Sequence, residues 1–236
     1  MNLLTSSNPK TKKGEDLGYM TFILHLAPNT MNDKGQNLCP MATKGCIVSC
    51  LNTAGMGGIF QSVKDSRRKK SNYFVNDRSN FLNDLYYEIS ISILKAKKNN
   101  LIPVFRLNGT SDIQWENIKM KDNKTVFELF PDITFYDYTK IANRFNKKLP
   151  ANYHLTFSYS AEKDYYSGRI DQVTKDILSK GYNVSVVFGG ELPKTFLGYE
   201  VVNGDETDLR FTDKNKIIGL KAKGKAKYDK TGFVIK

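Results

Sequence analysis

Short apolar runs, rich in β-branched and aromatic residues, alternate with polar turn residues along this chain. Runs of this kind, bounded by Gly, Asn, Asp and Ser, are typical of β-strands. Six of them predict strands, at residues 18–27, 101–109, 133–139, 153–160, 183–190 and 216–224. Their nearly continuous apolar character indicates strands that are buried on both faces, as in a parallel sheet.

Helices are predicted between these strands. Residues 78–100 carry Phe81, Leu85, Ile89 and Ile93 at four-residue spacing, which places the four side chains on one helix face. Shorter helices are predicted at residues 139–147 and 170–180. Alternating strands and helices are the pattern of an α/β fold. We therefore expect either a partial, open parallel β/α barrel of about six strands or an open, mostly parallel sheet.

The ends of the chain and its apolar runs bear on domain organisation. Residues 1–17 are polar and predict a flexible N-terminal arm, and residues 18–236 predict a single α/β domain. No apolar run approaches the roughly 20 residues that a membrane helix needs, and the N-terminal segment lacks the pattern of a signal peptide. We expect a cytoplasmic protein with no membrane partner.

The charge is strongly positive, with 36 Lys and Arg against 24 Asp and Glu and a formal net charge of +12. Such a surplus favours an anionic partner, either nucleic acid or a phosphorylated metabolite. The densest basic run, "KDSRRKK" at residues 64–70, fits nucleic-acid contact and fits a solvated helix face equally well.

All three cysteines of the chain, Cys39, Cys46 and Cys50, lie within one segment. An odd number of thiols cannot pair off into disulfides. Three thiolates could hold a [4Fe–4S] cluster, and they could hold zinc if His25 or His154 supplied a fourth ligand. Thiols that are simply packed in the interior are the third interpretation.

A cluster held by three cysteines has one iron without a protein sulfur, and that open iron can bind a ligand. The loop between Cys39 and Cys46 contains Gly45 and is predicted to be flexible enough to wrap a cluster. His154, in the middle of a predicted strand, is interpreted as a core histidine instead of a ligand.

Polar side chains follow the carboxyl ends of the predicted strands. In parallel α/β folds these ends meet at one edge, where active sites lie. Asp137 and Lys140 are candidates for catalysis, Asp137 as a general base, although a structural ion pair would explain it equally well. We expect five of the strand-end residues to line one cavity with the cysteine sulfurs: His25, Asn108, Asp112, Asp137 and Ser158. The candidates for cofactor binding are His25, Asn108, Thr110, Ser111, Asp112, Ser158 and Ser160.

Six segments of the chain resemble the family known as phage gene product 88. They come in the same order as in that family and cover nearly the whole chain, at residues 18–28, 39–57, 106–116, 135–140, 150–160 and 203–213. The resemblance implies an origin in a phage or mobile element, and hence the cytoplasm of the host cell. It implies no particular reaction.

The layout is also similar to that of radical S-adenosylmethionine enzymes, which carry three cluster cysteines in the loop after the first strand of a partial barrel. The cysteine spacing here differs from that family's motif. The similarity implies a [4Fe–4S] protein whose open iron binds S-adenosylmethionine or another small-molecule or nucleotide ligand, with the enzymatic activity left open. The alternative is a non-catalytic, nucleic-acid-associated phage accessory protein with a structural cluster or zinc.

Overall fold

A computed structural model describes residues 1–6, 9–50, 52 and 55–236. Residues 7 and 8 of the predicted arm lie outside the described residues, as do residues 51, 53 and 54 of the cysteine-containing segment at residues 39–57. All six predicted strands are present: β2 (Tyr19–Leu24), β3 (Ile102–Arg106), β4 (Thr134–Thr139), β5 (Tyr153–Ser158), β6 (Asn183–Phe188) and β9 (Ile217–Lys221). The described residues form four more strands: β1 (Leu4–Thr5), β7 (Thr195–Phe196), β8 (Tyr199–Asn203) and β10 (Val234–Ile235).

Within the part of the chain that the structure describes, the strands follow the order β1-β2-β3-β4-β5-β6-β9-β8-β7, and β10 pairs with β6. The pairs β1–β2 and β7–β8 are antiparallel. The pairs β2–β3, β3–β4, β5–β6, β6–β9, β8–β9 and β6–β10 are parallel. The fold is therefore mixed α/β with a mostly parallel sheet that is not closed. The expected open sheet fits this arrangement, and the partial barrel of six strands stays a prediction.

Two of the predicted helices are confirmed, and the third is shorter and of a different type. Residues 139–147 form only a 3₁₀ helix, η4 (Ala142–Asn146), because Thr139 still belongs to β4 and its hydroxyl accepts a hydrogen bond from the Ile141 N–H at 3.0 Å. The α-helices are α1 (Pro9–Glu15), α2 (Lys44–Val48), α3 (Gly55–Ile59), α4 (Gln61–Asn76), α5 (Arg78–Lys98), α6 (Val126–Leu129) and α7 (Ile170–Ser179). The other 3₁₀ helices are η2 (Trp115–Asn117), η3 (Lys121–Asn123), η5 (Tyr165–Gly168), η6 (Arg210–Thr212) and η7 (Gly224–Tyr228).

The chain divides into two compact units, which are described separately. Unit 1 comprises Met1–Pro40, Ser62–Asp137 and Leu149–His154. Unit 2 comprises Met41–Gln61, Tyr138–Lys148 and Leu155–Lys236. Cys39 thus belongs to unit 1, and Cys46 and Cys50 belong to unit 2.

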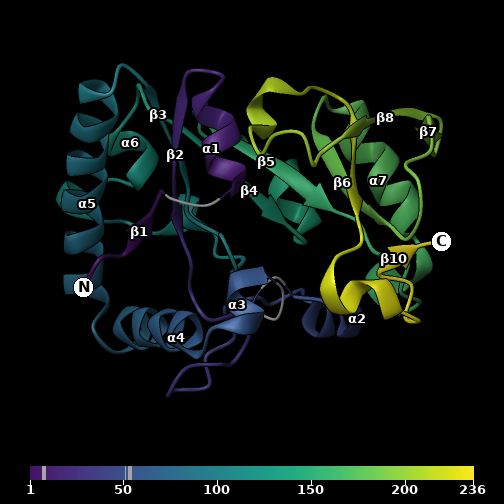
Figure 1. Cartoon of the computed structure of the whole chain (residues 1–236), viewed down its shortest axis with the longest axis horizontal. Helices are drawn as coiled ribbons and strands as arrows, with labels where there is room; N and C mark the ends of the chain where they lie inside the picture. Colours follow the sequence, from purple (N-terminus) through teal and green to yellow (C-terminus); the bar gives the residue numbers. More distant parts are fainter. Residues whose placement is uncertain (7–8, 51, 53–54) are drawn as a thin grey trace. The chain divides into compact units, whose positions relative to one another are not determined.

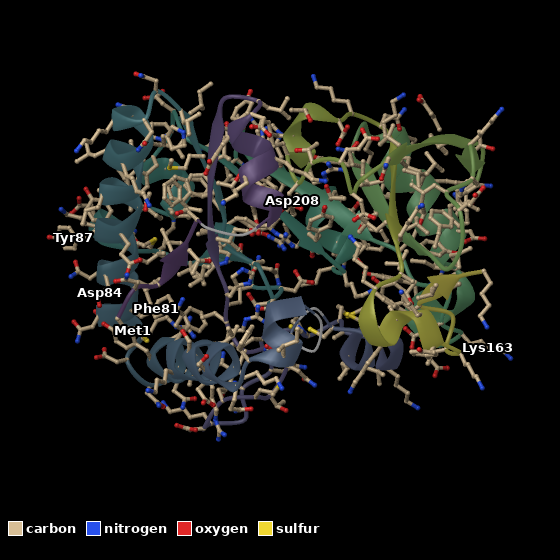
Figure 2. The ribbon with its side chains drawn as sticks, in the orientation of Figure 1. Met1, Phe81, Asp84, Tyr87, Lys163 and Asp208 are labelled. Atoms are coloured by element: carbon tan, nitrogen blue, oxygen red, sulfur yellow. The ribbon has the colours of Figure 1, made fainter. Side chains whose placement is uncertain are left out.

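In unit 1 the long helix α5 packs against β1 and β3 (Figure 1). Of its predicted apolar face, Phe81, Leu85 and Ile89 are fully buried and Ile93 is half-buried, whereas Tyr87 on another face is 53% exposed (Figure 2). A spacing of four residues predicts this face because residues i and i+4 lie one above the other on a helix.

The N-terminal residues of unit 1 form an edge strand. The carboxylate of Glu88 accepts hydrogen bonds from the backbone N–H of Leu3 at 2.6 Å and of Leu4 at 2.8 Å. The buried ammonium of Lys70 donates to the carbonyl of Leu3 at 2.7 Å. Leu4 pairs with Leu24 of β2. Part of the segment predicted as an arm therefore contributes a strand to the sheet.

Unit 2 is built around β6, which pairs with β5, β9 and β10. Helix α7 packs against β6 and buries Ile170, Thr174, Ile177 and Leu178. Among the described residues of the whole chain, no helix is long and apolar enough to cross a membrane.

Candidate functional site

The thiol of Cys39 lies against the loops that follow β2 and β3 in unit 1. Its sulfur accepts a hydrogen bond from the backbone N–H of Asn29 at 3.4 Å and lies 3.8 Å from the carbonyl oxygen of Thr110. The backbone N–H of Asp112 donates to the carbonyl of Leu38 at 2.8 Å, so the residue before Cys39 is tied to the β3 loop. Cys39 therefore lies at the carboxyl ends of parallel strands, as the sequence predicts.

Asn108 organises the loop after β3. Its Oδ1 accepts hydrogen bonds from the hydroxyl of Ser111 and the N–H of Ile113, both at 2.9 Å, and from the indole N–H of Trp115 at 3.3 Å. Its Nδ2 donates to the carbonyl of Ile113 at 2.9 Å. Asn108 and Ser111, predicted as cofactor contacts, thus have a local structural role in shaping the loop.

Thr110 connects the same loop to the segment after β2. Its hydroxyl donates to the carbonyl of Leu26 at 2.5 Å, and the backbone N–H of Gly109 donates to the carbonyl of Leu24 at 2.9 Å. Asp112 is 9% exposed, with its backbone held by Leu38. Its side chain is therefore nearly buried, on a loop that this backbone hydrogen bond fixes.

Asp137 in β4 is 1% exposed, and its carboxylate is surrounded by donors. One oxygen accepts the backbone N–H of Asn108 at 2.7 Å, and the other accepts the hydroxyl of Tyr153 at 3.0 Å and the Asn108 Nδ2 at 3.4 Å. A buried carboxylate needs such donors to offset its desolvation. These bonds give Asp137 a structural role in fixing the β3 loop, and its role as a base stays a prediction.

His25 follows β2, at the same edge of unit 1. Its pKa is lowered from 6.5 to about 3, first by burial and then by the positive charges of Arg67, Arg106 and Lys70, in that order. A Cβ on Gly109 would lie 2.5 Å from the His25 Nδ1, so only glycine lets the β3 loop approach the ring this closely. His25 is therefore a neutral imidazole at pH 7, the form that can ligate a metal or accept a hydrogen bond.

Cys46 and Cys50 belong to unit 2, where Cys46 lies in helix α2. The side chain of Thr43 caps this helix by accepting the N–H of Cys46 at 3.3 Å. The sulfur of Cys50 accepts the N–H of Asn52 at 3.4 Å. All three cysteines of the chain are half-buried thiols outside disulfides.

The predicted site residues of unit 2 lie at the end of β5 or just after β4 and β5. The hydroxyl of Ser160 donates to the carboxylate of Glu162 at 2.8 Å, and that carboxylate accepts the N–H of Gly45 in α2 at 2.9 Å. The buried Lys140 donates to the carbonyl of Ser158 at 3.3 Å. The contact between Lys140 and Ser158 therefore involves the backbone oxygen of Ser158.

Gly45 and Glu162 are the residues whose role the sequence did not reveal. Gly45 was expected to make its loop flexible, and this expectation is wrong, because it is buried inside α2 against Thr231 and Phe233. The sequence offered one signal for Glu162, which is that this acidic residue comes just after the end of the predicted strand at residues 153–160.

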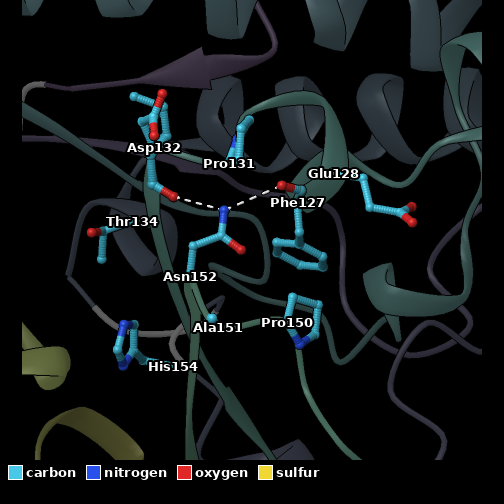
Figure 3. Close-up of a pocket in the computed structure, with 10 residues that line it drawn as sticks. Phe127, Glu128, Pro131, Asp132, Thr134, Pro150, Ala151, Asn152 and His154 are labelled. Atoms are coloured by element: carbon cyan, nitrogen blue, oxygen red, sulfur yellow. Dashed lines mark hydrogen bonds between the residues drawn. The ribbon is translucent and has the colours of Figure 1, made fainter.

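The expectation of a core histidine at position 154 is also wrong, because the His154 side chain is exposed. It lies on the wall of an open pocket of about 550 Å³ in unit 1 (Figure 3). The amide of Asn152 in this pocket donates to the carbonyls of Phe127, Phe130 and Ile133. The pocket lies where β4 and β5 begin, at the opposite strand ends from His25 and Asp112. None of the residues predicted for catalysis or cofactor binding line it.

The basic run at residues 64–70 lies within α4, and its residues differ in exposure. Arg68 is exposed and pairs with Asp33 at 3.4 Å, and Lys69 is also exposed. Lys70 is 3% exposed and holds Leu3, and burial lowers its pKa. Only part of the run is therefore open to an anionic partner.

The described residues contain no group of three or more His, Cys, Asp or Glu side chains arranged to hold a metal ion. Each unit contains a set of polar loops at the carboxyl ends of its parallel strands. Backbone N–H groups donate to the sulfurs of Cys39 and Cys50, and Cys46 lies on a capped helix. This defines an α/β protein with a cysteine-bearing segment next to its strand-end loops.

The chain belongs to the Gene product 88 family, whose model it matches over residues 2–236. The resemblance to phage gene product 88 is thus confirmed over nearly the full length. No curated protein and no solved structure matches the chain.

Proposed function

We propose that Cys39, Cys46 and Cys50 together bind one [4Fe–4S] cluster, and that the protein is a radical S-adenosylmethionine-like enzyme on a partial β/α barrel. The observation that carries the proposal is that the only three cysteines of the chain fall within twelve residues. Three thiolates suit a [4Fe–4S] cluster with one open iron, whereas a structural zinc site normally takes four protein ligands.

The surroundings of two sulfurs support this proposal. Cys39 and Cys50 each accept a backbone N–H hydrogen bond at 3.4 Å. Donors of this kind stabilise the thiolate that ligates iron, and hydrogen bonds to cluster sulfurs tune the reduction potential. When bound, the cluster would supply an iron at which S-adenosylmethionine, or another small-molecule or nucleotide ligand, can coordinate.

The remaining side chains would bind the polar part of this ligand. Asp112 would accept hydrogen bonds from an amino group or a ribose, because it lies on the fixed loop that also holds Cys39. Neutral His25 would accept a further hydrogen bond. Both predicted catalytic residues have partners within the protein, since the oxygens of Asp137 hold Asn108 and Tyr153 and the ammonium of Lys140 donates to Ser158. Either residue would have to exchange a partner to act on the ligand.

Anaerobic purification, followed by a visible absorption spectrum and iron and sulfide analysis, tests the cluster. We expect a coloured protein with about four iron and four sulfide per chain, and loss of most iron in each single Cys→Ala variant. Electron paramagnetic resonance of the reduced protein, with and without S-adenosylmethionine, tests the ligand. An unchanged signal would contradict the radical-enzyme part and leave the cluster intact.

The net charge of +12 favours a second candidate function, a nucleic-acid-associated phage protein in which the cysteines hold a structural cluster or zinc. The exposed Arg68 and Lys69 of α4 would contact phosphates. A colourless protein that contains one zinc and binds nucleic acid would support this candidate over the first.

A further inference from the structure

Helix α2, which carries Cys46, is too short to be stable by itself. It spans five residues, Lys44–Val48. Isolated helices shorter than about 12 residues are marginal in water, so the conformation of α2 depends on contacts with the rest of unit 2. These contacts therefore decide where the Cys46 thiol lies.

Glu162 supplies the first of these contacts. Its side chain is 8% exposed. One carboxylate oxygen accepts the N–H of Gly45 at 2.9 Å, and the other accepts the hydroxyl of Ser160 at 2.8 Å. The first N–H groups of a helix have no partner inside the helix, and a carboxylate at this end is favoured by the helix dipole. Glu162 thus fixes the first turn of α2 directly before Cys46.

The second contact comes from a turn near the end of the chain, residues 229–234. A Cβ on Gly45 would collide with the Thr231 hydroxyl and lie 2.5 Å from the Phe233 Cβ, so only glycine fits. Thr231 is itself held by Asp229, which accepts its hydroxyl at 2.8 Å and the N–H of Val234 at 3.1 Å. The turn is therefore a rigid surface against which α2 is seated.

We infer that Glu162, together with the turn at residues 229–234, positions the Cys46 thiol by holding α2 at Gly45. The inference deepens the proposed function, on which it rests for what Cys46 binds. The positioning itself concerns the thiol and can be measured without any cluster. Ser160, predicted as a cofactor contact, belongs to this arrangement through its hydrogen bond to Glu162.

The test is the alkylation rate of each cysteine by iodoacetamide in cluster-free protein, resolved by tandem mass spectrometry. In Glu162→Gln the charged acceptor is lost, and we expect Cys46 to react about tenfold faster because α2 opens more often. Gly45→Ala should have a similar effect. Asp164→Asn is the matched control, since it makes the same charge change at an exposed residue two positions away.

Cys39 is the internal reference, because its sulfur contacts Asn29 and Thr110 and its rate should not change. A Cys46 rate in Glu162→Gln within about twofold of the unmodified chain would overturn the inference. If circular dichroism shows that Glu162→Gln does not fold, Ser160→Ala, which keeps the carboxylate, serves instead. It should raise the Cys46 rate by about threefold, and an unchanged rate would again overturn the inference.

Iron analysis of the same proteins separates this inference from the proposed function. A faster Cys46 in the variants, together with no iron in the unmodified chain, would support the positioning and contradict the cluster. Bound iron in the unmodified chain, together with an unchanged Cys46 rate, would contradict the positioning and support the cluster.

Discussion

The hydroxyl of Tyr153, at the start of β5, donates a 3.0 Å hydrogen bond to the buried carboxylate of Asp137 in β4. The same carboxylate accepts the backbone N–H of Asn108 at 2.7 Å. One acidic side chain therefore holds the loop that carries Ser111 and Asp112. The geometry of the candidate site in unit 1 depends on this buried charge being satisfied.

Removing the Tyr153 hydroxyl tests that dependence. We expect Tyr153→Phe to lower the free energy of unfolding by about 1–3 kcal/mol, because a buried carboxylate oxygen loses a donor. Urea denaturation followed by circular dichroism measures this change. Tyr87→Phe, at a 53% exposed tyrosine, is the control and should change stability by less than about 0.5 kcal/mol. Equal effects of the two substitutions would contradict the role of the hydroxyl.

The lowered pKa of His25 predicts a dependence of stability on pH. The pKa falls from 6.5 to about 3 on folding, so below pH 6.5 the unfolded chain binds a proton that the folded chain does not. Protonation of the unfolded chain thus does not affect the free energy of unfolding above pH 6.5. As the pH falls from 6.5 toward 3, it lowers the free energy of unfolding by about 1.4 kcal/mol per pH unit.

A His25→Gln variant should lack this slope in urea denaturation measured across the same pH range. His154→Gln is the matched control, since the chain has only two histidines and His154 is exposed. The interpretation would be wrong if both variants, or neither, lost the slope.

Replacing Asp112 by alanine tests the binding of the ligand separately from the binding of the cluster. We expect Asp112→Ala to keep its iron, because the cysteines alone would hold it, and to lose the change in the paramagnetic resonance signal on addition of S-adenosylmethionine. Circular dichroism controls for folding. Loss of iron in Asp112→Ala would show instead that the residue supports the cysteine segment through its loop.

The exposed basic residues of α4 test the contact with nucleic acid. Neutralising Arg68 and Lys69 to Gln should weaken any binding and reduce the slope of log affinity against log salt concentration by about 1–2. Filter binding or fluorescence anisotropy at several salt concentrations measures this slope. Lys12 and Lys13, in α1, give a matched control pair. An unchanged slope in the α4 variant would mark these two residues as a solvated face.

Much of the fold could be predicted because its strands are marked by local patterns. The six longer apolar runs all form strands, and the spacing of Phe81, Leu85 and Ile89 predicts the buried face of α5. The four strands that were not predicted are short or partly exposed; β1, for example, has two residues. The pairing of β1 depends on a distant partner, as with Leu4 and Leu24, which no local pattern reveals.

The candidate site was predictable to a smaller extent. Parallel strands end at one edge, so the polar residues after β2 and β3 were expected near Cys39, as the structure of unit 1 shows. Which atoms bind one another could not be predicted. Asn108 and Asp137 are 29 positions apart, and Gly45 and Glu162 are 117 apart, so their hydrogen bonds arise only once the sheet has formed.

The iron and sulfide content of anaerobically purified protein tests the central claim most directly. The account predicts about four iron and four sulfide per chain, lost when Cys39, Cys46 and Cys50 are all replaced by alanine. The triple variant is a clean control, because these are the only three cysteines of the chain. A colourless protein without iron, or one with a single zinc that the triple variant loses, would contradict it.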